Sequence, residues 1–374
     1  RGASALRGYL REAAWRALAR FGPAAGVAAL FAFGQFEVPS LAALKTRELW
    51  GRPVQSAWTV ALFDAHADMQ SLGGSLRLAV PAVLVQLAGL VPLLMWLQRR
   101  PERGWRDERQ NRFGLIARTV ATLGLGAAVG LTVGIPIGVL AWETGLSGWK
   151  ELAESSWRLN AFLPELRRSL LIGAAAAAVA GGLIWAVSFI RGTVGTTALV
   201  LLIAPGLCGP LVAALLVKWL VTTAAADGWP GGRALQESYL PLTAAIALSL
   251  LPRAALLRAF SPGRTSARHL VRLLRAGTRS QRRAAGRLWW GLVGRSLWLR
   301  WGLLALWGSA DISAAALLAP AGGATAMPGL YGLMHYGHNA ALGALSLIAT
   351  VLPAGLLAAG AFVVPKLATL GRTS

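Results

Sequence analysis

The chain has 374 residues, of which 55% are hydrophobic and 14% are charged, whereas ordinary soluble domains carry about 25% charged residues. This composition argues against a soluble protein with a single core. The 37 Lys and Arg residues against 15 Asp and Glu residues give a formal charge of +22, which alone fits nucleic-acid binding as well as a membrane protein. The basic residues lie between long apolar stretches, however, and this placement favours a membrane protein with no nucleic-acid partner.

Eight apolar stretches are long enough to cross a bilayer, whose hydrocarbon core of about 30 Å needs about 20 helical residues. They are predicted near residues 22–44, 78–97, 119–142, 169–190, 193–217, 239–257, 301–319 and 340–364. Proline and glycine occur inside several of them, which membrane helices tolerate because neighbouring helices satisfy the backbone. The sequence therefore predicts an all-α, polytopic helical membrane protein with about eight transmembrane helices.

The distribution of Lys and Arg over the loops predicts the orientation. If the N-terminus is cytoplasmic, the segments on that side hold the basic residues by a ratio of about three to one. Acidic residues are more frequent on the other side, and the even number of spans places both ends in the cytoplasm. Nothing resembles a secretory signal peptide, and the chain begins at Arg1 without an initiator Met, so we expect the start to be a cut within a longer protein.

The beginning and the end of the chain follow the same plan. Near the start, a basic stretch that begins Gly2-Ala3-Ser4 leads into the span at 22–44. Near the end, a basic stretch that contains Ala276-Gly277-Thr278 leads into the span at 301–319. Each copy closes with an outer loop and one more span. This order of parts indicates an internal, parallel repeat.

Each copy of the repeat places one acid at the same point of its span. Glu37 and Asp311 are the two acids assigned inside spans, where an ionisable group is costly unless it faces other helices or water. One interpretation is a residue of the translocation path or gate at a pseudo-twofold interface. The alternative is a structural acid that pairs with a hydroxyl group or a helix end near the outer boundary.

On these features the chain resembles the binding-protein-dependent inner-membrane permeases of bacterial ATP-binding-cassette importers, specifically the fused two-half permeases of the iron(III), thiamine and phosphonate group. In that family each half has six spans, and a coupling loop with the pattern Glu-Ala-Ala, three residues, Gly docks on the ATPase. The resemblance implies that residues 1–97 are the C-terminal part of the first half, with the end of a coupling loop and two spans. Residues 98–118 are then a cytoplasmic linker. Residues 119–374 are the second half of the 6+6 layout, with a coupling loop at about 258–300.

The second coupling loop departs from the family pattern. If Gly277 is the motif glycine, Val271-Arg272-Leu273 stands in place of Glu-Ala-Ala; if Arg275 takes that position, His269-Leu270-Val271 does. Neither register restores the acid. The resemblance assigns ATPase coupling to Gly2, Ala3, Ser4, His269, Leu270, Val271, Ala276, Gly277 and Thr278. The alternative for the arginine-rich second loop is a basic amphipathic helix held by anionic lipid.

The resemblance also implies the partners and the location of the protein. These are a dimer of nucleotide-binding subunits, an extracytoplasmic substrate-binding protein and the lipid of a bacterial inner membrane, with ferric iron slightly favoured as the substrate. The chain contains no Gly-x-x-x-x-Gly-Lys-Ser/Thr phosphate loop and no catalytic constellation, so ATP hydrolysis is assigned to a separate chain. We predict a transport subunit that is not an enzyme and has no cofactor.

Two further expectations concern metals and the energy source. His335 and His338 lie three residues apart in an outer loop and could ligate a metal ion, but tight binding would slow ion release, so no metal site is predicted. The alternative function is a secondary transporter driven by an ion gradient. That class predicts broken spans with unwound centres and midplane acids.

Overall fold

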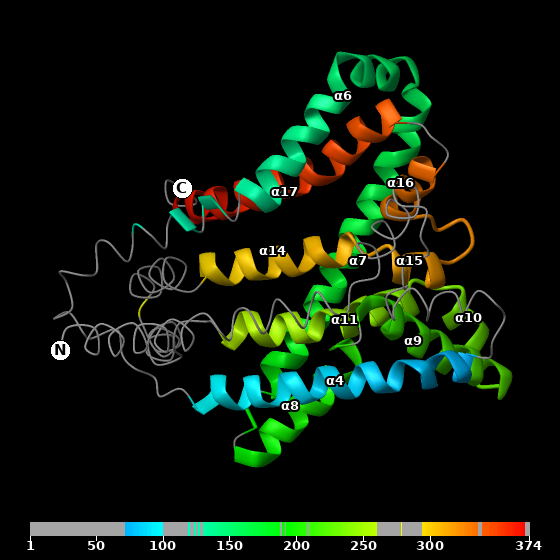
Figure 1. Ribbon diagram of the computed structural model, residues 1–374, viewed down its shortest axis with the longest axis vertical. Coiled ribbons are helices and arrows are strands. Elements are labelled where there is room, and N and C mark those ends of the chain that lie inside the picture. Colours follow the sequence, from blue (N-terminus) through cyan, green and yellow to red (C-terminus); the bar gives the residue numbers. More distant parts are fainter. Residues whose placement is uncertain are drawn as a thin grey trace, which may run out of the picture. The chain divides into compact units, whose positions relative to one another are not determined.

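The computed structural model describes residues 72–99, 130–187, 189–190, 192–207, 209–259, 278, 294–335 and 339–370, with isolated positions between 119 and 127. These residues form helices and connecting turns, and no strand occurs among them (Figure 1). Four helices in this part of the chain are long and apolar enough to cross a membrane: Ser156–Val187, Gly209–Ala226, Leu240–Arg258 and Ala341–Gly360. The prediction of an all-α helical membrane protein is confirmed. The count of eight spans and the 6+6 layout stay predictions, and the first predicted span, at 22–44, lies outside the described residues.

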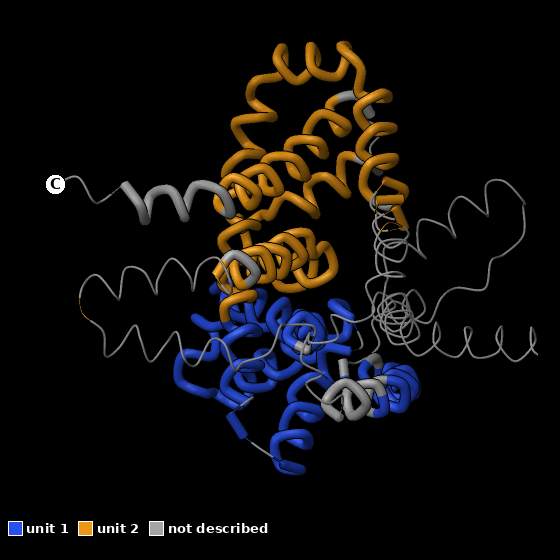
Figure 2. Tube along the Cα trace, turned by 90° about the vertical axis from the view of Figure 1, so that its left-hand side faces the viewer, with its two compact units in different colours: residues 1–99, 179–259 blue, residues 100–178, 260–374 orange. Residues whose placement is uncertain are grey.

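The described helices belong to two compact units (Figure 2). Unit 1 takes residues up to 99 and residues 179–259, and unit 2 takes residues 100–178 and 260–374. Helix α7 (Ser156–Val187) begins in unit 2 and ends in unit 1. These units divide the chain differently from the predicted permease halves, which are successive in sequence.

Unit 1 is built around α11 (Leu240–Ala259), which packs on α8 (Gly192–Leu207) and α9 (Gly209–Ala226). Helix α4 (Leu72–Arg99) packs on α8 and α9, and the short α10 (Gly232–Gln236) lies against α9 and α11. The candidate span in α11 is the most enclosed of the four, with 67% of its most apolar window buried. Helix α4, predicted to close the first permease half, thus packs with helices predicted to belong to the second half.

The contact between α8 and α11 needs a glycine. A Cβ atom at Gly206 would meet the carbonyl oxygen of Leu248 and the ring of Pro252. On either side of this contact, Ile203 and Leu242 are fully buried. Small residues that let two backbones approach closely are typical of helix packing in membranes.

The predicted single span at 193–217 is wrong, because α8 ends at Leu207 and α9 begins at Gly209. Gly209 has a φ of 84°, a left-handed conformation that glycine adopts without steric cost and that a continuous helix does not allow. The break divides the apolar stretch into helices of 16 and 18 residues. As a consequence, α9 extends past residue 217 into the stretch before the predicted span at 239–257, which also contains α10.

Helix α4 buries a face that combines small residues with one amide. Ala79, Ala82 and Gln86 lie three and four residues apart on this face, and Gln86 is 0% exposed. Within the part of the chain that the structure describes, neither amide atom of Gln86 has a hydrogen-bond partner. A buried polar group without a partner costs about 1–3 kcal/mol of stability.

Replacing this amide should stabilise the protein. Gln86→Met keeps an unbranched side chain and removes both polar atoms, so we expect the free energy of unfolding to rise by about 1–3 kcal/mol. The measurement is the thermal unfolding midpoint in detergent. Gln236→Met, at the exposed end of α10, is the matched control and should leave the midpoint unchanged. A lower midpoint for Gln86→Met would contradict the prediction and show that the amide is satisfied in the folded protein.

Unit 2 is organised by α17 (Asn339–Leu370), which packs most extensively on α6 (Ile135–Glu154) and lies beside it in Figure 1. Helix α17 also contacts α14 (Arg295–Ser309) and α16 (Ala326–His335). A single π-helical turn, η2 (Gly130–Gly134), leads into α6. The predicted span at 340–364 therefore corresponds to α17.

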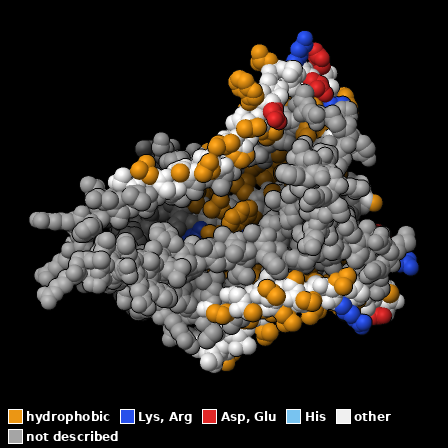
Figure 3. All heavy atoms as spheres, in the orientation of Figure 1, with side chains coloured by type: hydrophobic (Ala, Val, Ile, Leu, Met, Phe, Trp, Pro, Cys, Tyr) orange, Lys and Arg blue, Asp and Glu red, His pale blue; other side chains and the backbone are white. Residues whose placement is uncertain are grey.

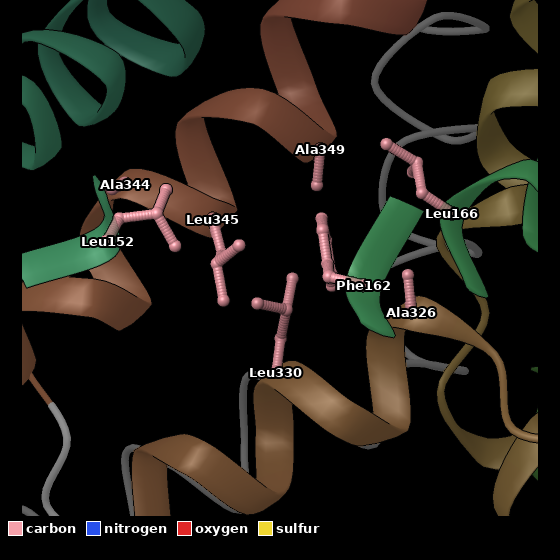
Figure 4. Packing of buried hydrophobic residues seen from close by; sticks show 8 residues of the cluster. All are labelled: Leu152, Phe162, Leu166, Ala326, Leu330, Ala344, Leu345 and Ala349. Carbon is pink, nitrogen blue, oxygen red and sulfur yellow. The ribbon is translucent and has the colours of Figure 1, made fainter. Parts of the chain in front are cut away.

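The hydrophobic core of unit 2 lies where α6, α7, α16 and α17 meet (Figure 4). Its buried side chains come from these four helices and are Leu152, Phe162, Leu166, Ala326, Leu330, Ala344, Leu345 and Ala349. Farther along α17, the Trp298 Nε1 atom of α14 donates a hydrogen bond to the carbonyl of Leu357 at 3.1 Å. Gly302 faces the side chain of Leu357, where a Cβ atom would collide. These contacts fix α6, α14 and α16 on α17.

Residues 143–168, between the predicted spans at 119–142 and 169–190, are helical. Helix α6 continues to Glu154, and α7 begins at Ser156. Within α6, Gly145 departs from helical geometry with a φ of 52° and a ψ of −167°, which kinks the helix. The charged side chains of Lys150 and Glu154 are exposed on the helix surface.

Candidate functional site

Two of the predicted site residues, Asp311 and Thr278, are among those that the structure describes. Thr278 is exposed and lies outside any helix. The other predicted site residues lie outside the described part of the chain: Gly2, Ala3, Ser4, Glu37, His269, Leu270, Val271, Ala276 and Gly277. The candidate site is therefore built around Asp311.

Asp311 lies at a break in the predicted span at 301–319. Helix α14 ends at Ser309 and α15 (Ser313–Leu318) begins after three further residues, so the prediction of one continuous span is wrong. The backbone N–H of Ala310 closes α14 by bonding to carbonyl groups of the last turn. Asp and Ser favour helix ends because their short polar side chains bond to nearby backbone groups, and both occur here.

The carboxylate of Asp311 caps the helix that follows the break. Its Oδ1 atom accepts a hydrogen bond from the backbone N–H of Ala314 at 2.8 Å, and the residue is 9% exposed. A negative charge at a helix N-terminus is also favoured by the helix dipole. This contact is the kind of pairing with a helix end that the structural alternative for this acid expects. A role in the translocation path stays a prediction.

One face of α7 contacts the chain both before and after the break at Asp311. Gly173 faces the end of α14, where an added Cβ atom would meet the carbonyl oxygen of Ala305 and the backbone nitrogen of Ser309. One turn earlier, the Oγ atom of Ser169 accepts a hydrogen bond from the N–H of Ala326 at 3.0 Å, at the start of α16. Positions four residues apart share a face of a helix. The end of α14 and the start of α16 are therefore anchored on neighbouring turns of α7.

Four polar side chains are buried on α7, at the break between α14 and α15, and just before α16. We call them the polar cluster: Ser169, Asp311, Ser313 and Thr325, each at most 9% exposed. The Oγ1 atom of Thr325 has no hydrogen-bond partner within the described ranges. Just before it in sequence, the carbonyl of Ala324 accepts a hydrogen bond from Nη1 of Arg168 at 3.1 Å. Buried polar groups are costly, so their concentration marks the region as the candidate site.

The side chains of the polar cluster are hydrogen-bonding groups. They comprise one carboxylate and three hydroxyl groups, which can accept and donate hydrogen bonds. Among the residues that the structure describes, no group of three or more His, Cys, Asp or Glu side chains could hold a metal ion. His338 and the side chain of His335 lie outside the described residues.

Sequence reasoning found Asp311 and missed the other residues that build the site. Ser169 and Gly173 form a small-xxx-small pattern within an apolar helix, a signal for close helix contact in membranes that could have identified this face of α7. Thr325 lies in the loop between α15 and α16, and no sequence pattern identifies it.

No protein-family model, no curated protein and no solved structure matches this chain. The function of the candidate site is therefore inferred from its own residues and their geometry.

Proposed function

We propose that this chain is the transmembrane permease subunit of a bacterial ATP-binding-cassette importer, located in the inner membrane with both ends in the cytoplasm. It translocates a substrate that an extracytoplasmic binding protein delivers. A dimer of separate nucleotide-binding subunits hydrolyses the ATP, so the chain itself is not an enzyme. Ferric iron is the substrate that the sequence resemblance favours.

The observation that carries this proposal is the position of α11 immediately before the arginine-rich segment. Helix α11 holds the most enclosed of the four candidate spans, and the segment at 260–294 connects its end to α14. A force applied to that segment is therefore passed to a helix that is packed firmly on α8 and α9. Rigid-body gating requires such a firm element next to the surface on which the partner acts.

The last turn of α11 is also fastened to α7. The Nη1 atom of Arg258 donates a hydrogen bond to the carbonyl of Ile184 at 2.9 Å, within unit 1. Ile184 itself is 2% exposed, so the bond reaches a buried part of α7. A displacement of the arginine-rich segment would thereby move the ends of two helices together.

Retention of a nucleotide-binding subunit tests the proposal. The full-length protein is expressed with candidate nucleotide-binding subunits and purified in detergent through a tag, and the ATPase activity that co-purifies is measured. Replacing Ala276, Gly277 and Thr278 with Trp should reduce it at least about tenfold, because bulky side chains no longer fit a groove made for small ones. Gly104→Trp, in the predicted linker at 98–118, is the control and should retain the ATPase.

Two results would contradict the proposal that this chain is part of an importer. The first is a native protein that retains no ATPase from any candidate subunit. The second is substrate uptake in sealed vesicles that follows an ion gradient and proceeds without ATP.

The helix breaks favour a second candidate function, a secondary transporter driven by an ion gradient. Broken helices with charged groups at the break are typical of such proteins, and α14 is separated from α15 at Asp311 as α8 is separated from α9 at Gly209. This function requires that the charge of Asp311, and not only its hydrogen bond, takes part in transport. We prefer the importer to the secondary transporter because the hydrogen bond from Ala314 explains why an acid stands at position 311 without a coupling ion.

A further inference from the structure

The helical segment around the kink in α6 exposes large apolar side chains. Trp142 is 87% exposed, Leu146 is 89% exposed and Trp157 is 66% exposed. Exposed apolar surface of this kind marks a site of interaction. We propose that residues 142–157, the interfacial segment, lie in the headgroup layer of one leaflet and bind phospholipid. This inference rests on the membrane character of the chain and not on the proposed importer function.

Contacts with α17 place the interfacial segment at the end of a membrane span. A Cβ atom at Gly343 would collide with the hydroxyl group of Thr144, just before the kink. After the kink, Leu152 belongs to the same buried cluster as Ala344 and Leu345 (Figure 4). The candidate span of α17 begins at Ala341, so these contacts involve its first turn. The first turn of a span lies at the boundary between hydrocarbon and headgroups, and the interfacial segment lies at the same level.

Beyond the kink, α6 presents three different faces. The first is buried and contains Gly148 and Leu152. The second is an exposed apolar stripe whose members are spaced three and four residues apart: Leu146, Trp149 and Ala153. The third carries Lys150 and Glu154, which are exposed and paired at 3.9 Å. An apolar stripe beside a charged one is the arrangement of a helix that lies in the plane of a membrane surface.

The start of α7 adds the aromatic and charged side chains that headgroups favour. The Nη1 atom of Arg158 pairs with Oε1 of Glu151 at 3.1 Å, and the guanidinium group lies 5.4 Å from the centre of the Trp157 ring. In Figure 3, acidic and basic side chains gather at the α6 end of unit 2, next to hydrophobic ones. Tryptophan is enriched at the interface, where its ring meets the acyl boundary while neighbouring charges meet the headgroups.

Lipid is the occupant that these observations favour. The apolar stripe lies next to the face of α6 that packs on the first turn of the α17 span. At this level, side chains that do not face protein are surrounded by lipid. The charged side chains in this region are Lys150, Glu151 and Glu154 of α6 and Arg158 of α7, and their opposite charges suit zwitterionic headgroups. If this segment projected into water instead, the exposed Trp142 and Leu146 side chains would be in contact with solvent.

Spin labelling can measure the depth of the interfacial segment. Cys208 is the single cysteine of the chain, so Cys208→Ser provides a background free of other thiols. Leu146→Cys places a label on the apolar stripe, and Glu154→Cys places the control label on the charged face of the same helix. The full-length protein is reconstituted in nanodiscs of phosphatidylcholine and phosphatidylglycerol. The accessibility of each label to molecular oxygen and to a water-soluble nickel chelate is then measured.

We expect the ratio of oxygen to nickel accessibility at position 146 to exceed that at position 154 several-fold, because oxygen concentrates in the bilayer. A ratio at position 146 as low as that of a label in water would place the stripe in water and overturn the proposal. If neither reagent reaches the label at position 146, protein and not lipid covers the stripe, and this result would also overturn the proposal. If Leu146→Cys is not monodisperse, Ala153→Cys on the same stripe gives the same comparison.

Discussion

Asp311→Asn is expected to keep both the stability and the uptake of the native protein, whereas Asp311→Ala is expected to lose about 1–3 kcal/mol of unfolding free energy. The reason is the bond from the backbone N–H of Ala314 to Oδ1 of Asp311. An asparagine side chain offers an acceptor oxygen in the same place, and Asn caps helices about as well as Asp. Alanine leaves the N–H of Ala314 buried and without this partner.

The two substitutions separate a structural acid from one whose charge takes part in transport. Unfolding midpoints in detergent measure the cap, and substrate uptake in proteoliposomes with the partner subunits measures the function. If Asp311→Asn unfolds like the native protein but loses uptake, the charge itself is required, and the predicted gate role and the secondary transporter gain support. If Asp311→Ala is as stable as the native protein, the bond to Ala314 does not stabilise the break.

The membrane character was predictable because the bilayer imposes it on every helix separately. A span must supply about 20 apolar residues whatever its neighbours are, so length and composition identify α11 and α17 without tertiary information. The properties of membrane helices also explain why the helix break within a predicted span was missed. Gly and Pro are tolerated inside membrane helices, so Gly209 in the apolar stretch at 193–217 did not reveal that the helix ends there.

The sequence identified a residue of the candidate site only where its burial in a membrane span is energetically unfavourable without a partner. Asp311 stood out because an acid in a span needs a partner, but its partner is a backbone N–H, which has no sequence signature. Ser169 and Gly173 are ordinary residues for a membrane helix, and their role comes from the approach of α14 and α16 to α7. The kink at Gly145 lets α6 carry charges on one face and remain packed on another, an arrangement that the charge distribution alone did not predict.

Gly173→Val is expected to destabilise the protein strongly. The added side chain would meet backbone atoms of Ala305 and Ser309, which cannot move away as the tip of a flexible side chain can. Overpacking of this kind costs about 3 kcal/mol at the upper end of its usual range. Because Ser309 ends α14 two residues before Asp311, we also expect uptake to fall with the stability.

Gly182→Val is the matched control, since the two glycines lie on the same helix and nothing lies within 4 Å of a Cβ atom at Gly182. Its unfolding free energy should stay within about 0.5 kcal/mol of the native value, because only helix propensity changes. Thermal midpoints of the two variants, measured side by side, decide the question. Equal midpoints would mean that α14 does not approach α7 at Gly173. The end of α14 and the start of α16 would then not be anchored on neighbouring turns of α7.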